Sequence, residues 1–246
     1  MQTLNLAQGS PEWLAHRRTS FNASDAPAMM GCSPYKTRSA LLHELHTGIS
    51  PEHDAATERR FADGHRFEAL ARPLAQDIVG EELYPVTGTT QVSGLSRQLS
   101  ASFDGLTLLA DMGFEHKSLN DELRAIQHFV GQQLPVQYRV QMEHQMLVSG
   151  ADKILFMASK WAGDELVEER HCWYASDAAL RAEILAGWKQ FDADLKVYVP
   201  PTAAAVEKVV AEPVEALPAP VVQVTGQIAL QDNFKVRSEE HTSELQ

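Results

Sequence analysis

The order in which two hydrophobic periodicities follow each other restricts the fold of this chain more than any other feature. Apolar residues recur at helical spacing in residues 57–79, at Phe67, Leu70, Leu74 and Ile78. From about Leu83 to Lys117 the pattern changes to short runs rich in Val, Thr and Leu, broken by Gly, Asp and Ser. That pattern predicts a meander of antiparallel strands.

The second half of the chain continues the alternation of helical and strand patterns. Residues 120–131, 135–149 and 176–195 have helical composition, whereas 153–159 and 166–174 have the composition of strands. The resulting order of elements predicts an α/β (α+β) fold, with helices layered around one sheet.

Helix-capping signals add three short helices before residue 57. Ser10 followed by Pro11 predicts the start of the first helix, because serine caps the free amides and proline fits the first turn. A second helix is expected from a Ser24 cap to a terminating Gly31, and a third from Thr37 to Gly48.

A change of composition near Pro200 divides the chain. Residues 1–199 are expected to form one domain, and 200–221 a linker rich in Pro and Ala. Residues 222–236 are interpreted as the start of a truncated C-terminal unit. Residues 237–246 match a translated sequencing adapter and are expected to be a non-native tail.

Composition excludes several classes of protein. No apolar run is long enough for a membrane span, and the N-terminus does not have the pattern of a signal peptide. The two cysteines, Cys32 and Cys172, form no CxxC pair, which argues against a disulfide scaffold or a zinc ribbon and favours a reducing cytoplasm. A net charge of −12 gives no support to general affinity for nucleic acid, so phosphate binding requires local basic clusters.

The stretch "SFDGLTLLADMGFEHK" (102–117) carries the candidate chemistry. Glu115 and Lys117 lie on one face if the segment is a strand, and a hairpin would return the chain beside Asp104. Two neighbouring carboxylates repel each other unless a divalent cation binds, and such oxygen ligands suit Mg²⁺ or Mn²⁺. On its own, however, an ExK triplet is more simply read as two solvated charges on an edge strand.

Asp104…Glu115-His116-Lys117 resembles the PD-(D/E)xK nuclease signature. The surrounding sequence is similar to one branch of it, the YqaJ-like viral recombinase or lambda-type exonuclease family. The similar blocks are "GSPEWLAHRRTSFNASDAPAMMGCSPYKT", "DGHRFEALARP", "SASFDGL", "EHKS" and "QYRVQMEHQM", in consistent order over roughly residues 8–195. Phe103 replaces the proline of the first motif, which leaves the metal-ligating Asp unchanged. The resemblance implies a restriction-endonuclease-like core: a central mixed sheet flanked by helices, with an N-terminal helical segment.

The resemblance also implies roles for individual residues. Asp104, Glu115 and the backbone carbonyl of His116 would hold a metal ion, and Glu68 a second metal or its water. Lys117 would position and activate the attacking water, with Gln141 beside it.

Arg17 and Ser24 would bind a terminal 5′ phosphate, and Tyr138 would line the site near the DNA. Simpler alternatives remain open for three residues. Glu68 can form a surface ion pair with Arg72, Gln141 can belong to an ordinary amphipathic helix, and Ser24 can be only a helix cap.

The function implied is a metal-dependent exonuclease that digests double-stranded DNA ends 5′→3′ and leaves 3′ single strands in phage-type homologous recombination. The alternatives are an endonuclease with the same site and a non-catalytic module that binds DNA ends. The implied partners are duplex ends and a single-strand annealing protein, and members of the family can form a toroidal homotrimer. The expected location is the cytoplasm of a bacterial host, with a phage or prophage origin.

The distribution of charge favours the N-terminal helices as the DNA-facing surface. Residues 1–72 carry as many basic as acidic side chains, so the acidic excess lies further along the chain. The basic residues are Arg17, Arg18, Lys36, Arg38, Arg59, Arg60, Arg66 and Arg72.

Overall fold

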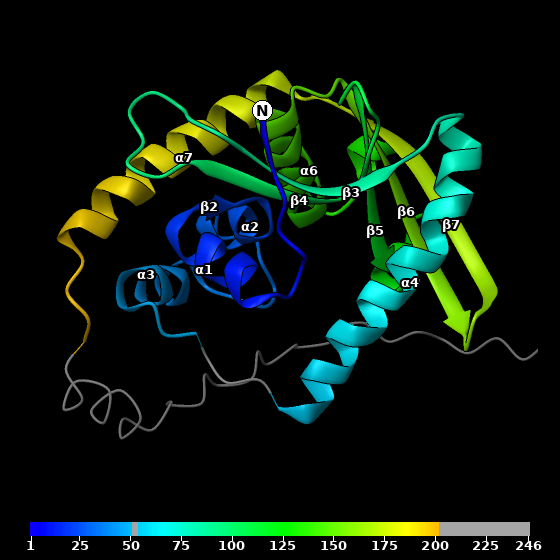
Figure 1. The fold of residues 1–246 in the computed structure, drawn as a ribbon, viewed down its shortest axis with the longest axis horizontal. Coiled ribbons are helices and arrows are strands. Elements are labelled where there is room, and N and C mark those ends of the chain that lie inside the picture. Colours follow the sequence, from blue (N-terminus) through cyan, green and yellow to red (C-terminus); the bar gives the residue numbers. More distant parts are fainter. Residues whose placement is uncertain (51–53, 202–246) are drawn as a thin grey trace, which may run out of the picture. The chain divides into compact units, whose positions relative to one another are not determined.

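A seven-stranded mixed sheet is the centre of the fold. The structure is a computed structural model that describes residues 1–50 and 54–201 of the chain. The strands pair in the order β1 (Gln2–Leu4), β3 (Tyr84–Thr90), β4 (Leu99–Leu106), β5 (Met112–Ser118), β6 (Lys153–Ala162) and β7 (Glu165–Ala175), as Figure 1 shows. Strand β2 (Phe21–Asn22) pairs with β4, and the pairs β2–β4 and β5–β6 are parallel. The predicted meander and the two later strands are confirmed, whereas β1 and β2 were not predicted.

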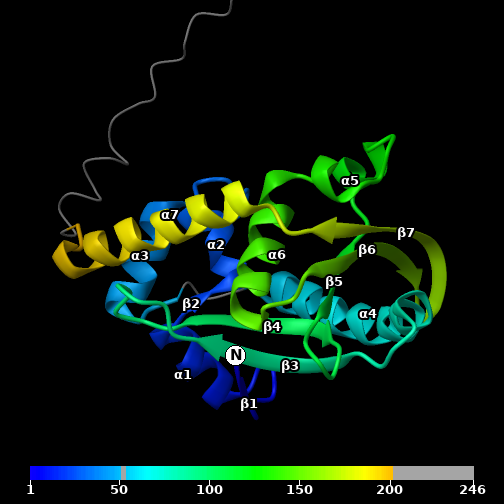
Figure 2. The ribbon, with the colours of Figure 1, turned by 90° about the horizontal axis from the view of Figure 1, so that it is seen from above.

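Helices cover both faces of the sheet. On one face, Ala71 and Ala75 of α4 (Ala55–Val79) pack against Phe114 of β5 and Leu155 of β6. The other face is covered by α6 (Val136–Ser149), with α7 (Ala178–Val197) beside it (Figure 2). This arrangement confirms the predicted fold class. Among the described residues, no helix combines the length and the apolar character needed to cross a membrane.

The N-terminal helices begin as predicted, with one exception. Ser10 and Thr37 cap α1 (Pro11–Thr19) and α3 (Arg38–Thr47). The predicted Ser24 cap is wrong. Ser24 lies inside the 3-10 turn η1 (Ala23–Asp25), which runs into α2 (Ala26–Met29), and its hydroxyl accepts a hydrogen bond from Arg17 instead. A contact with the preceding helix α1 therefore replaces the cap that the sequence pattern indicated.

The buried stripe of α4 is displaced by one residue from the predicted apolar face. Ala71 and Ala75 are buried together with Glu68, whereas Ile78 is exposed. Small alanines let the helix approach the sheet closely, so that a carboxylate at the next buried position is brought to the strands. The first turns of α4 extend beyond the sheet (Figure 1).

The helix predicted at 120–131 is mostly wrong. Helix α5 (Asp121–Ala125) ends at Ala125, and a 3-10 turn, η2 (Gly131–Gln133), follows. The guanidinium of Arg170 on β7 donates hydrogen bonds to the carbonyls of Leu123, Arg124 and Ile126 at 2.6–2.9 Å. These bonds satisfy the free carbonyls at the helix end, which allows the chain to leave the helix there.

Strands β4 and β5 pair over a very short length. Their register contains Gly105 with Phe114 and Leu106 with Gly113. Beside this contact, β4 has a β-bulge where it pairs with β3. Between the pairs Tyr84–Leu106 and Val86–Phe103, β4 advances by three residues while β3 advances by two. We call the place where β4 and β5 stop pairing, at Asp104 and Glu115, the fork.

A buried carboxylate joins α6 to the junction between β7 and α7. Glu143 is fully buried and accepts hydrogen bonds from Tyr174 Oη (3.1 Å), Ser176 Oγ (2.8 Å) and the Asp177 amide (2.9 Å). It also forms an ion pair with Arg181 at 2.7 Å. Arg181 also donates to Ser176 Oγ at 2.8 Å, so the partners of Glu143 form one connected network. This cluster is expected to stabilise the fold strongly.

Glu143→Ala is therefore expected to lower the free energy of unfolding by about 3 kcal/mol, because it leaves several donors unsatisfied at a buried position. Urea unfolding followed by circular dichroism would measure the change. The exposed Glu183 on α7 provides the control, since Glu183→Ala is expected to change stability by no more than about 0.5 kcal/mol. Equal losses in the two variants would contradict a structural role for the cluster.

Residues Met1–Pro200 form one compact unit. The predictions for the Pro/Ala-rich linker beyond residue 201, for the start of a further unit and for the non-native tail lie outside the described residues.

Candidate active site

Glu115 is the centre of a polar cluster at the fork. Its side chain is buried, and three donors surround the carboxylate. Gln141 Nε2 donates to Oε1 at 2.6 Å, Gln145 Nε2 donates to Oε2 at 2.6 Å, and Lys117 Nζ forms an ion pair with Oε1. The two glutamines lie one helical turn apart on α6, so a single helix holds both oxygens of the carboxylate.

Asp104 lies on β4 at the bulge, opposite Glu115. The amide of His116 donates a hydrogen bond of 2.7 Å to Asp104 Oδ2. If β4 and β5 continued to pair here, the His116 amide would donate to a backbone carbonyl of β4. The Asp104 carboxylate accepts this hydrogen bond instead. The bulge and the fork together therefore turn the carboxylate of Asp104 toward β5.

Glu68 reaches the same region from α4. Arg72 joins it to β4, because its Nη2 pairs with Glu68 Oε1 at 3.1 Å and its Nε donates to the Asp104 carbonyl at 2.7 Å. The simpler interpretation of Glu68, an ion pair with Arg72, is therefore confirmed by the structure. The side chain of Glu68 is nevertheless buried, and a cavity of about 300 Å³ borders both residues.

The three carboxylates affect one another's protonation. Burial raises the pKa of Asp104 well above its usual range, and the charges of Glu115 and Glu68 raise it further. Burial also raises the pKa of Glu68; Arg72 opposes this shift and Glu115 adds to it. The fork therefore concentrates negative charge that lacks full compensation.

Lys117 remains a cation. Burial alone would lower the pKa of its ammonium group, but the neighbouring Glu115 and Asp104 outweigh this effect and raise the pKa. The lysine therefore offers a positive charge and a proton donor.

His116 and Tyr138 complete the surroundings. Burial, with a contribution from Lys117, lowers the pKa of His116 to about 4, and its ring shares a hydrogen bond of 2.7 Å with Ser159. Tyr138 is buried on α6, and its hydroxyl accepts a hydrogen bond from Asn120 at 3.4 Å. The His116 side chain is thus neutral and used in packing, which leaves its backbone as the group available to the site.

The predicted phosphate-binding residues form a second cluster, built around Asp25. Arg17 Nη2 donates to Ser24 Oγ at 3.0 Å and pairs with Asp25 at 3.4 Å, while its guanidinium lies over the Trp13 ring. Lys36 pairs with the other oxygen of Asp25 at 3.2 Å. The buried Asp25 holds the two cations together, and Arg17 binds the Ser24 hydroxyl beside them. Two cations and a hydroxyl are groups that can bind an anion.

No three carboxylate, histidine or cysteine side chains are spaced as a formed metal site within residues 1–50 and 54–201. At the fork, the Glu115 carboxylate is instead bound by Lys117, Gln141 and Gln145. The metal ligands therefore stay a prediction. The contacts that connect the predicted residues are Glu68 to Arg72, Arg72 to the Asp104 carbonyl, the Asp104 carboxylate to the His116 amide, and Lys117 to Glu115.

Comparison with known proteins decides the family. The model of the YqaJ-like viral recombinase domain matches residues 12–152, more than half of the chain, and includes Glu68, the fork and both glutamines. The chain belongs to the YqaJ-like viral recombinase family. A comparison with curated protein sequences gives no match.

Two solved structures share the fold of this YqaJ-like protein. The alkaline exonuclease LHK-Exo from Laribacter hongkongensis is 26% identical, with a TM-score of 0.59 over 76% of this chain and 93% of that chain. LHK-Exo in complex with dAMP is 25% identical, with a TM-score of 0.60 over the same shares. The resemblance inferred from the sequence is thus confirmed at the level of family and fold.

Sequence reasoning missed several residues of the YqaJ-like site. Gln145 contacts Glu115 as closely as Gln141 does, and Arg72 joins Glu68 to β4. The i, i+4 spacing of Gln141 and Gln145 was a usable signal, because it places both amides on one side of a helix. Asp25 and Lys36 gave no such signal, since their pairing depends on tertiary structure.

Gln145→Ala is expected to lower the kcat of DNA cleavage by roughly 10- to 100-fold, because it frees one oxygen of Glu115 to reorient. Single-turnover digestion of a linear duplex would measure this. Gln137 is a matched control on the same helix, since its amide contacts Glu122 and not the fork. A Gln145→Ala variant as active as Gln137→Ala would show that Glu115 does not need this support.

Proposed function

We propose that this protein is a metal-dependent exonuclease that digests double-stranded DNA ends 5′→3′ and leaves 3′ single strands in phage-type homologous recombination. The observation that carries the proposal is the convergence of Glu68, Asp104 and Glu115 with the ammonium of Lys117 at the fork. The family assignment and the exonuclease names of the two structural neighbours support it.

The chemistry of the donor set fits a hard divalent cation. All side-chain candidates are carboxylates, and the raised pKa values of Asp104 and Glu68 reflect burial and repulsion that a cation would relieve. Asp104, Glu115 and the His116 carbonyl would hold the ion, with Glu68 at a second ion or its water. Lys117 would release Glu115 Oε1, which it contacts in the structure. Bound Mg²⁺ or Mn²⁺ would stabilise charge on the phosphate and lower the pKa of a coordinated water.

The chain's own residues supply orientation and charge. Gln141 and Gln145 keep Glu115 in one rotamer, and the His116 amide does the same for Asp104. Lys117, protonated and partly exposed, places positive charge where negative charge grows on the phosphate in the transition state. Arg72 holds Glu68 at the edge of this region.

The cluster around Asp25 favours an exonuclease over an endonuclease. Arg17, Ser24 and Lys36 would together bind a terminal 5′ phosphate, a group that only a strand end carries.

The proposal includes partners and location. Duplex ends are the substrate, and a single-strand annealing protein would receive the 3′ strand. A homotrimer around the duplex would line its channel with the basic residues of the N-terminal helices. The site of action would be the cytoplasm of a bacterial host.

Digestion of linear duplex labelled on one 5′ end tests the proposal. With Mg²⁺, label is expected to appear first as a mononucleotide, and EDTA is expected to stop its release. A closed circular duplex of the same sequence should resist digestion. Cutting of the circle would support the endonuclease, and an inert linear duplex would remove the nuclease assignment.

A further inference from the structure

Tyr35 presents an aromatic ring to solvent beside the phosphate-binding cluster. It is 87% exposed, the highest value among the large hydrophobic side chains of the described residues. It follows Pro34 in the turn between α2 and α3. The protein itself does not cover this aromatic ring, so the ring is available to pack against a ligand.

The turn that carries Tyr35 is held by hydrogen bonds and ion pairs. The amides of Tyr35 and Lys36 both donate to Ser33 Oγ at 3.2 Å. Lys36 Nζ is bound to Asp25 at 3.2 Å and to Glu44 at 2.7 Å. Because the backbone is fixed on both sides of the ring, a ligand that covers the ring orders little additional chain.

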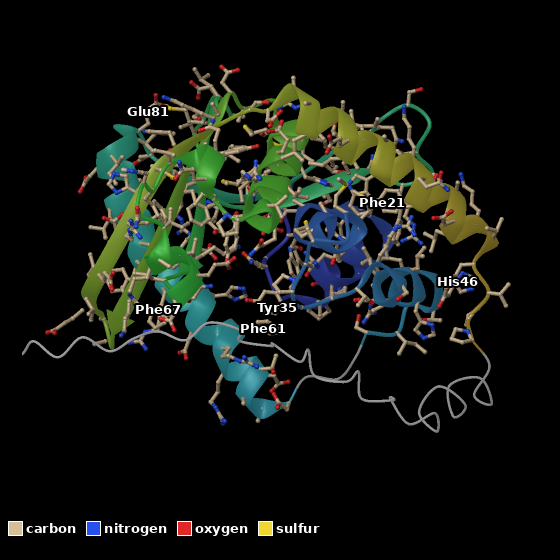
Figure 3. All side chains as sticks on the ribbon, turned by 180° about the vertical axis from the view of Figure 1, so that it is seen from behind. Phe21, Tyr35, His46, Phe61, Phe67 and Glu81 are labelled. Carbon is tan, nitrogen blue, oxygen red and sulfur yellow. The ribbon has the colours of Figure 1, made fainter. Side chains whose placement is uncertain are left out.

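The ring lies beside the phosphate cluster, on the side of the N-terminal helices that faces α4. Its neighbour Lys36 shares Asp25 with Arg17. The Tyr35 hydroxyl is also near enough to Tyr138 on α6 to add to the rise that burial causes in the pKa of Tyr138, whereas the hydrogen bond from Asn120 and the charge of Lys117 oppose this rise. Figure 3 shows Tyr35 between the N-terminal helices and α4.

We propose that Tyr35 is a positioning residue whose ring stacks on the base of the 5′-terminal nucleotide. This inference rests on the proposed function and adds how the substrate is held. The terminal nucleotide connects two phosphates, its own 5′ phosphate and the one that is cleaved. With the first at Arg17 and Ser24 and the second at the fork, its base lies over the intervening surface, where Tyr35 is exposed.

Stacking suits an enzyme that must accept every base. Each base has an aromatic face, so a tyrosine ring binds all of them without reading their edges. Tyr35 therefore contributes affinity for the end and fixes the terminal nucleotide against rotation, with little sequence preference.

The test compares normal duplex ends with ends whose 5′-terminal nucleotide has no base, both carrying a 5′ phosphate. On normal ends, Tyr35→Ala is expected to raise KM by roughly 5- to 100-fold. Tyr35→Phe and Tyr35→Trp are expected to keep KM close to that of the wild type. On abasic ends Tyr35→Ala is expected to match the wild type, because the stacking partner is missing in both.

Quenching of a fluorescent base reports stacking on the terminal nucleotide and does not depend on the stability of the protein. With 2-aminopurine as the terminal base, binding without Mg²⁺ is expected to quench emission in the wild type and in Tyr35→Phe, but not in Tyr35→Ala. Because Tyr35 is exposed, the thermal unfolding midpoint of Tyr35→Ala should equal that of the wild type. An unchanged midpoint would exclude loss of folding as the cause of the missing quenching.

The outcomes separate the two proposals. If wild type leaves linear duplex intact, the proposed nuclease function fails and this inference fails with it. If wild type digests duplex but Tyr35→Ala has the wild-type KM, or loses equally on abasic ends, the exonuclease stands and the stacking role is overturned.

Discussion

Replacing Lys117 with alanine is expected to lower the kcat of duplex digestion by about 10²–10³-fold, with a smaller change in KM. The lysine is protonated and bound to Glu115, so the variant loses a positive charge that acts mainly when charge develops on the phosphate. Quenched-flow digestion of a 5′-labelled linear duplex with saturating Mg²⁺ would measure kcat.

Folding and nonspecific charge effects need their own control in this experiment. Lys160 on β6 is exposed, so Lys160→Ala removes the same charge at another place and is expected to retain activity. Removing Lys117 leaves Glu115 with its two glutamine contacts, and the variant should therefore fold. Wild-type kcat in Lys117→Ala would show that the fork does not perform the chemistry.

Arg17→Ala is expected to abolish the preference for a 5′ phosphate over a 5′ hydroxyl. The wild type should digest the phosphorylated duplex at least about 30-fold more efficiently, judged by kcat/KM, because truncating one partner of a charge-assisted contact costs about 2 kcal/mol or more. The variant loses the guanidinium that joins Ser24 to Asp25, and it should treat the two substrates alike.

Arg18 is the matched control for Arg17, as its neighbour on α1 with an exposed side chain. Arg18→Ala should keep the preference for the phosphate and weaken binding to all duplexes slightly, in a salt-dependent way. If both variants retain the preference, the cluster around Asp25 is not a phosphate pocket.

The sequence predicted the layers of the fold because periodicity reports burial. Strands β3 to β7 and helices α4, α6 and α7 lie close to their expected ranges, since each lies in a segment with a periodic or strand-like pattern, and α3 lies between its predicted caps. Strands β1 and β2 consist of three and two residues whose pairing partners lie far along the chain, so no local pattern marks them. Helix α5 is short for a related reason, because Arg170 ends it from another strand.

The candidate site was partly predictable. Asp104, Glu115 and Lys117 could be proposed from alternation along a strand and from the hairpin that joins them. Glu68 required the family resemblance, since a glutamate four residues before an arginine is ordinary on a helix surface. The spacing of Gln141 and Gln145 placed both amides on one side of a helix but did not show which acid they contact. Lys36 could not be assigned, because its contacts arise only when η1 and α3 come together.

The short pairing of β4 with β5 has a mechanical consequence. The strands on either side of this seam, β1–β3–β4 and β5–β6–β7, are each joined by longer ladders than the two residue pairs that connect them. Few backbone hydrogen bonds cross this seam, so α4 and α6, which contact strands on both of its sides, supply much of the connection between the two halves. Bending of the sheet at the seam would therefore require these helices to shift on the strands. The carboxylates of Asp104 and Glu115 lie on its two borders, and their separation would follow such bending directly.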